Sequence, residues 1–413
     1  MKKRITTFVL LFLFICGYFI LYHRDKELKY IPNNADAVVL VDTKQAVRQY
    51  MISFISHPSE WFNTKNKKGN TISIQQSGVK IPDFLQIFHL ENTGFSDWYC
   101  ILELKDKSGF LTYLMQNSFA EKGNNLFQKD HLFIKIEQDY CIAGTSNSAF
   151  ENIKRQFSTF SQRTNFNSDQ FIDGSLASIA LIKKGQIRNF PVRLNSDNIE
   201  ISNGANEDFN SVVAKLQKRH HFIDSELDND NIQKITSIFK NNISDSVQID
   251  YLQATADLQQ VNDTIITYEY DDNFNEVEKK TIQKIVQPSY CISLKTSMPE
   301  KALQYFKNKK WVNAQGQFTV IPFQPNIIEK KSAGLEIHST KKTVRASFSL
   351  NENYIFIKNN ALLFSGLKSL TSKEKRIVSD IDYIFYGNKG QQYYIQLQFK
   401  KRSLPLMLRW GND

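Results

Sequence analysis

The sequence predicts an α+β fold in which one N-terminal transmembrane helix precedes two related strand-helix-hairpin-helix units with mainly antiparallel sheets. Three observations support this prediction. A long apolar run opens the chain, short strand-like runs are interspersed with amphipathic helical segments, and several short motifs recur in the second half in nearly the same order. The composition is that of a folded body, because 41% of the residues are hydrophobic and 13% aromatic, whereas disordered chains are depleted in both.

The opening run, residues 5–22, contains no charged residue and follows Met1-Lys2-Lys3-Arg4. As a helix its 18 residues span about 27 Å, close to the hydrocarbon thickness of a bilayer. A cleavable signal peptide has a shorter apolar region and a cleavage site of small residues, and this run has neither. We therefore expect an uncleaved signal-anchor in a bacterial inner membrane, single-pass.

The orientation of this anchor rests on weaker signals. Three basic residues stand on each side of it, so the positive-inside rule gives a tie. A short amino-terminal side favours a body in the periplasm, and a cytoplasm-facing body is the alternative. Cys16 suggests a second alternative, a lipoprotein, although Phe14 and Ile15 occupy positions where small residues are expected.

The pattern of segments divides the chain into four parts. Residues 1–29 form the anchor and its flank, 30–197 the first α+β unit, 198–245 a helical connector, and 246–413 a second unit with an insertion and a basic C-terminal part. Two domains are expected because about 380 residues after the anchor exceed one small core. A helix from about Lys44 carries a stripe that we interpret as a core face, formed by Val47, Tyr50, Met51, Phe54 and Ile55.

The internal repeat rests on four matches. Residues 290–292 and 99–101 are both Tyr-Cys-Ile, and a helix is expected after each, the second one starting at Pro299. Residues 356–358 match 133–135, and residues 389–391 match 184–186. Between the two copies, residues 264–270 and 276–286 predict a long hairpin. Apolar and polar residues alternate only partly along its arms, which predicts one solvent-exposed face.

The four cysteines are too few for a disulfide scaffold. Cys16 lies in the apolar run, and Cys100, Cys141 and Cys291 each lie in a Tyr-Cys-Ile strand segment, where cysteine behaves as a small buried hydrophobe. A bridge between Cys100 and Cys141 is the alternative, since cysteines in cross-strand register come within bonding range.

Motifs that carry catalysis are missing from the sequence. It contains no nucleophile elbow, phosphate-binding loop, dinucleotide fingerprint or His-Glu-x-x-His. Asp271, Asn273 and Asn275 resemble the start of a calcium loop, but Glu276 replaces its glycine and Ile282 its closing glutamate.

The histidines give no better site. His220 and His221 are adjacent at a helix end, whereas a helical metal pair stands at i and i+4. The sequence therefore predicts no catalytic, cofactor-binding or metal residues and no cofactor, and it leaves enzyme activity uncertain with the balance against it.

The net charge of +10 is concentrated at the two ends of the chain. Residues 298–413 carry nineteen basic residues against eight acidic ones, residues 1–29 carry six against two, and the stretch between carries 27 against 32. If its clusters share one face, the basic C-terminal part suits an anionic lipid, a glycan or an envelope protein, while nucleic acid is an unlikely partner. An ordinary solvated surface is the alternative. The clusters are Lys307, Lys309 and Lys310; Lys341, Lys342 and Arg345; and Lys400, Lys401 and Arg402.

Residues 31–42, IPNNADAVVLVD, resemble the start of uncharacterised bacterial cell envelope proteins that open with Ile-Pro-x-x-Ala-x-Ala-Val-Val after an anchor. The resemblance covers about the first 160 residues, and it departs from the family at Cys16, which lacks the lipoprotein context. It implies an envelope location and no assigned reaction, so no functional residues carry over. We expect a membrane-anchored structural or binding component of the envelope. An envelope hydrolase, or another enzyme with a non-standard active site, is the alternative.

Overall fold

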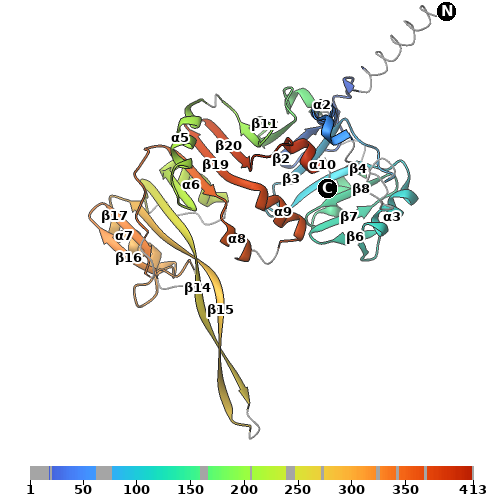
Figure 1. Cartoon of the computed structure of the whole chain (residues 1–413). Helices are drawn as coiled ribbons and strands as arrows, with labels where there is room; N and C mark the ends of the chain where they lie inside the picture. The colour runs from blue at the N-terminus through green and yellow to red at the C-terminus, as the bar shows by residue number, and fades with distance from the viewer. Residues whose placement is uncertain are drawn as a thin grey trace, which may run out of the picture. The chain divides into compact units, whose positions relative to one another are not determined.

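The computed structural model describes residues 18, 21–61, 77–158, 166–204, 207–238, 247–270, 274–321, 326–340, 344–366 and 370–411. The chain forms two compact units, one of residues 1–201 with 402–413 (unit 1) and one of residues 202–401 (unit 2). Strands account for 44% of the structure and helices for 24%. Figure 1 shows the elements with the labels used below.

Unit 1 contains β1 (Glu27–Leu28), β2 (Ala35–Asp42), β3 (Phe84–Leu90), β4 (Trp98–Glu103), β5 (Ala120–Glu121), β6 (Leu126–Lys129), β7 (Leu132–Ile136), β8 (Tyr140–Gly144), β9 (Phe166–Asn167), β10 (Ala177–Lys183), β11 (Gln186–Leu194) and β12 (Asn198–Ser202). Its helices are α2 (Thr43–Ile55), α3 (Lys107–Gln116), α4 (Phe150–Ser158) and α10 (Leu406–Gly411), with 3₁₀ turns η1 (Pro58–Trp61) and η5 (Ser168–Gln170). Apart from the small β1–β9 pair, the strands hydrogen-bond in the order β5-β6-β7-β8-β4-β3-β2-β10-β11-β12, all antiparallel.

The core of unit 1 is apolar along its middle strand. Val38 and Leu40 of β2 are fully buried and belong to the same cluster as Phe88 of β3 and Ile153 of α4. Burying each such side chain stabilises the fold by roughly 1.5–3 kcal/mol. A second cluster packs α3 against the β6–β8 strands through Phe110 and other buried residues.

Unit 2 contains β13 (Ile223–Asp228), β14 (Tyr251–Tyr270), β15 (Glu276–Lys295), β16 (Asn326–Lys331), β17 (Gly334–Ser339), β18 (Asn353–Lys358), β19 (Ile381–Lys389) and β20 (Gln392–Phe399). Its helices are α5 (Glu207–Gln217), α6 (Asn229–Ile238), α7 (Pro299–Asn308), α8 (Ala361–Gly366) and α9 (Ser372–Asp380). The strand order is β16-β17-β15-β14-β13-β18-β19-β20, again antiparallel. One cluster packs α7 on β15 and β17, and another packs α5 on β18, β19 and β20.

The two units share a strand order. We number the strands of unit 2 from rank 1 to rank 8 in chain order. The strands of unit 1 are numbered in the same way, with β1, β5, β6 and β9 left out. Both sheets then read 4-5-3-2-1-6-7-8. In both units the rank 1 strand ends in an aspartate that caps the following helix. Asp42 Oδ1 accepts from the Gln45 amide at 2.8 Å, and Asp228 Oδ1 accepts from the Asn231 amide at 2.9 Å.

The predicted α+β fold of strand-helix-hairpin-helix units is wrong. The structure is dominated by antiparallel sheet, and several of its pairings join strands that are distant in sequence, such as β2 with β10 and β13 with β18. Of the predicted matches, residues 99–101 and 290–292 lie on strands of equal rank, β4 and β15. Residues 133–135 and 356–358 lie on strands of rank 4 and rank 6, so they do not correspond. Local hairpins are visible in a sequence, whereas distant pairings depend on packing.

The predicted single-pass signal-anchor and inner-membrane location are also corrected. Across the described ranges, no helix has the length and apolar character needed to span a bilayer. Spanning takes about 20 apolar residues, and α2, the longest helix of these ranges, has 13. Of the predicted span, only Tyr18, Leu21 and Tyr22 belong to the described residues.

Two further predicted segments differ from the structure. The stripe on α2 is not a core face, because Val47, Met51 and Ile55 are exposed and the helix has no buried residue. The segment 198–245, predicted as a helical connector, contains strands β12 and β13 in addition to α5 and α6. The hairpin expected at 264–286 is the outer part of β14 and β15, as Figure 1 shows.

Candidate functional site

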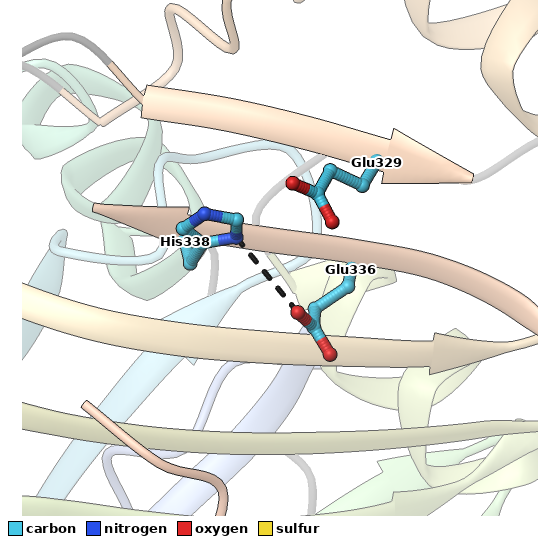
Figure 2. Close-up of side chains that lie close together, drawn as sticks. All are labelled: Glu329, Glu336 and His338. Atoms are coloured by element: carbon cyan, nitrogen blue, oxygen red, sulfur yellow. Dashed lines mark ion pairs between the residues drawn. The ribbon is translucent and has the colours of Figure 1, made fainter. Parts of the chain in front are cut away.

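Three side chains with metal-ligating groups converge on β16 and β17 of unit 2. Glu329 of β16 lies directly opposite Glu336 of β17, and His338 follows two residues later on β17. Side chains at i and i+2 of a strand point to the same face, and Figure 2 shows the three close together. Their ligand atoms lie within 4.8 Å of one another.

The electrostatics of this cluster are set by Lys331. Its Nζ lies 2.6 Å from Glu329 Oε2 and 3.8 Å from Glu336 Oε1. The hydrogen bond from Lys331 lowers the pKa of Glu329, and the same bond raises the pKa of Lys331. His338 Nδ1 is buried without a hydrogen-bond partner, 3.8 Å from Glu336 Oε1. A flexible ammonium group therefore balances the carboxylates, while the imidazole nitrogen stays unsatisfied.

Cys291 lies beside this cluster. It stands opposite His338 in the β15–β17 pairing and is only 5% exposed. Burial, followed by the nearby Glu336 carboxylate, raises the pKa of its thiol. The other two cysteines of the described chain, Cys100 and Cys141, are also free. They are offset by two residues in the β4–β8 register, where Cys100 pairs with Ala143 and not with Cys141, so the alternative of a bridge finds no support.

The sequence did not single out the cluster, although its signal is visible in hindsight. Glu336-Ile337-His338 places an acid and an imidazole on one face of a strand. The tight turn between Lys331 and Gly334 then fixes the register that brings Glu329 opposite Glu336. A scan for histidines spaced along helices does not detect such a pattern.

Two buried carboxylates lie on β13, and both are used by the chain itself. Glu226 accepts hydrogen bonds from the Tyr251 and Tyr354 hydroxyls, from Ser349 Oγ, and from the backbone amides of residues 350 and 351. Asp224 pairs with Arg219 at 2.9 Å and accepts from Ser347 and Tyr354. These bonds attach residues 347–351 to the sheet, so we interpret the network as structural.

One of the two adjacent histidines of the sequence has an acidic partner. His221 Nδ1 lies 3.1 Å from Asp257 Oδ1. Both histidines line an open cavity of about 430 Å³, together with Arg219, Asp257 and residues 344–348. The calcium-like positions Asp271 and Asn273 lie outside the described residues.

The basic C-terminal clusters are only partly described. Lys307, Lys309 and Lys310 are exposed at the end of α7, and Lys400 and Lys401 are exposed after β20. Arg345 is exposed beside the cavity with the histidines, and Arg402 belongs to unit 1. Lys341 and Lys342 lie outside the described residues. A shared basic face that binds an anionic partner stays a prediction.

The β14–β15 ribbon is an exposed feature of unit 2. β14 pairs with β13 only as far as Ala256, and β15 pairs with β17 only from Cys291 onward. Beyond these points the two strands pair only with each other among the described strands, and Figure 1 shows them extending past the sheet. All described residues within 262–282 are exposed.

One face of the outer ribbon carries four exposed apolar side chains. Ile266, Tyr268 and Tyr270 alternate along β14, and Ile282 lies on the same face because it pairs with Thr264. Tyr268 is 63% exposed and Ile282 is 71% exposed. We call these four residues the ribbon face. Charged residues of β15 complete this face. Glu276 and Glu278 lie near the turn, and Lys280 and Lys284 lie nearer the sheet.

No protein-family model, no curated protein and no solved structure matches this chain. The resemblance of residues 31–42 to envelope proteins therefore stays a prediction.

Proposed function

We propose that this protein is a non-catalytic binding and assembly protein that associates with a second copy of itself through the ribbon face. The observation that carries this proposal is the group of exposed apolar side chains of the ribbon face, on a ribbon with two free strand edges. It gives a specific form to the structural or binding role expected from the sequence.

The outer ribbon adds little to the stability of its own unit. An isolated two-stranded hairpin is marginally stable in water, and none of the ribbon face residues belongs to a core cluster. Fully burying one such side chain is worth roughly 1.5–3 kcal/mol, which the monomer forgoes. Contiguous exposed apolar surface of this kind is typical of an interaction site.

The order of charges favours a second copy in antiparallel orientation. From the turn toward the sheet, β15 presents Glu276, Glu278, Lys280 and Lys284 on the ribbon face. An antiparallel copy of β15 that places Glu276 of each chain opposite Lys284 of the other forms two opposite-charge pairs, while Lys280 faces its own copy at the two-fold axis. A parallel copy in register places like charges opposite each other.

The free strand edges supply the geometry for this association. The outer part of β15 has no neighbour except β14 among the described strands, so its outward-facing N–H and C=O groups can pair with another strand. An antiparallel pair of identical strands has two-fold symmetry, the commonest symmetry of protein dimers.

Enzymatic activity receives less support from the same unit. The carboxylates of Asp224 and Glu226 are engaged by hydrogen-bond donors of their own chain. The enzyme alternative stays a prediction without a site in this network.

Sedimentation equilibrium of the full chain tests the proposal. We expect a species of twice the 47.9 kDa chain mass. Tyr268→Lys with Ile282→Lys should shift it to one chain mass at the same concentration. The matched control is Phe95→Lys with Leu132→Lys, which changes two exposed apolar residues of unit 1 and should leave the dimer intact.

A charge exchange makes the test specific for the antiparallel arrangement. Glu276→Lys alone should weaken the dimer by roughly 5-fold or more, because it places two cations opposite each other. Adding Lys284→Glu to the same chain should restore the association. A wild-type chain that remains monomeric at high micromolar concentration contradicts the proposal, and so does a double exchange that fails to restore the dimer.

A further inference from the structure

We infer that Glu329, Glu336 and His338 form a binding site for one divalent transition-metal ion, with Zn²⁺ as the best fit. This inference is independent of the ribbon and goes beyond the proposed assembly function. It rests on the position of three ligand groups on two paired strands.

The spacing of the donor atoms fits one ion. A tetrahedral ion bound at about 2.0–2.2 Å requires ligand atoms roughly 3.4 Å apart. His338 Nδ1 and Glu336 Oε1 are 3.8 Å apart, and all three ligand atoms lie within 4.8 Å of one another. Small side-chain rotations close the remaining gap, because the register of β16 and β17 already brings the side chains to one place.

The state of His338 also favours a metal. A buried polar atom without a partner destabilises the structure, and Nδ1 of His338 is such an atom. Neutral imidazole nitrogen is a preferred ligand of Zn²⁺. An ion at this position therefore satisfies the nitrogen and neutralises Glu329 and Glu336 together.

The donor set selects among metals. One imidazole nitrogen and two carboxylate oxygens suit Zn²⁺ and neighbouring transition-metal ions, whereas Ca²⁺ and Mg²⁺ prefer oxygen ligands alone. Three protein ligands leave a fourth tetrahedral position for water or another small ligand. Cys291 is not assigned as a ligand, because its thiol is not among the ligand groups that converge within 4.8 Å of one another.

Lys331 competes with the metal for the same carboxylates. Its side chain is half exposed, so it can move into water when an ion binds, and its ammonium repels the incoming ion. Removing this charge by Lys331→Gln should therefore strengthen metal binding. A cluster that is only a surface ion-pair network predicts no effect of this substitution on Zn²⁺.

Calorimetric titration of the chelator-treated full chain with Zn²⁺ tests the inference. We expect one ion per chain, at least 10-fold weaker binding in Glu336→Gln and in His338→Ala, and at least 3-fold tighter binding in Lys331→Gln. His221→Ala and Glu278→Gln are matched controls elsewhere in unit 2, and Cys291→Ser is the control beside the site. These three variants should bind Zn²⁺ as the wild type does.

The outcomes separate this inference from the proposed function. Circular dichroism establishes that each variant is folded, and the ribbon variant Tyr268→Lys with Ile282→Lys should still bind one ion. The site is refuted if Zn²⁺ binding survives both Glu336→Gln and His338→Ala, or if even Lys331→Gln binds no Zn²⁺ at millimolar concentration. Loss of binding in Cys291→Ser overturns the assigned set of ligands.

Discussion

Units 1 and 2 order eight strands in the same way, yet they stabilise the rank 1 strand by different means. In unit 1, β2 buries Val38 and Leu40 in an apolar cluster. In unit 2, β13 buries Asp224 and Glu226, which are held by hydroxyl, amide and guanidinium groups. The comparison teaches that one strand order tolerates either an apolar or a polar centre, provided that the buried carboxylates have hydrogen-bond donors.

The rank 2 and rank 3 strands show the second difference. β3 and β4 have 7 and 6 residues, whereas β14 and β15 have 20 each. Most of the additional residues of unit 2 lie beyond the strands that flank them. All described residues within 262–282 are exposed, so this outer part contributes surface and not core. Unit 2 has in this way gained an exposed ribbon on a framework that unit 1 keeps short.

The largest loss of stability is expected when the polar centre of unit 2, formed by Asp224 and Glu226 with their hydrogen-bond donors, is disrupted. Glu226→Ala leaves several donors unpaired at a fully buried position, at about 1–3 kcal/mol each. We expect at least about 3 kcal/mol of lost stability in urea unfolding, and hydrogen exchange should locate the loss at residues 223–228. Glu226→Gln should cost less, since its amide oxygen still accepts. A loss below about 1 kcal/mol for Glu226→Ala would show that the network is not needed for the strand order.

A smaller loss of stability is expected from removing the helix caps, which stand at equal positions in the two units. Asp228→Ala removes a cap from α6 and should cost about 1 kcal/mol. Asp42→Ala removes the cap of α2 and in addition leaves Arg24 without its partner at 2.7 Å, so we expect about 2 kcal/mol or more. Thermal unfolding of both variants measures the difference. Equal losses would indicate that the Arg24 pair adds nothing to the cap.

The smallest expected effect is the loss of folding stability at alkaline pH that arises from Tyr251 in the polar centre. Burial, and then the bond to Glu226, raises the pKa of Tyr251 to about 12. Between about pH 10 and pH 12 the folded chain keeps a proton that the unfolded chain has lost. The contribution of Tyr251 to folding stability is therefore complete below about pH 10 and is lost as the pH rises toward 12.

The urea midpoint measured between pH 9 and pH 11 tests this response. Tyr251→Phe should flatten the decline, because the titrating hydroxyl is removed. The matched control is Tyr113→Phe in α3 of unit 1, which removes a tyrosine hydroxyl outside both the polar centre and the ribbon face and should leave the decline unchanged. An unchanged decline in Tyr251→Phe would assign the alkaline response to other residues.

The sequence alone reveals only part of the candidate site. The alternation of Glu336 and His338 can be read directly, because it depends on strand geometry alone. Glu329 joins them only through the register of the β16–β17 hairpin, and Cys291 lies beside them only because β15 pairs with β17. The ribbon was more accessible, since residues 264–286 carry a local hairpin pattern that needs no distant partner.

The sequence by itself determined the local elements whose hydrogen bonds stay within a short stretch of chain. The 264–286 hairpin and the helix that begins at Pro299 are of this kind. Only the tertiary structure decided which distant strands pair and which faces are buried. The stripe on α2 resembled a core face and is exposed, while β13, with the sequence IDSELD, buries two carboxylates. The reason is physical, because burial depends on the partners that packing brings from elsewhere in the chain, and those partners are not encoded in local periodicity.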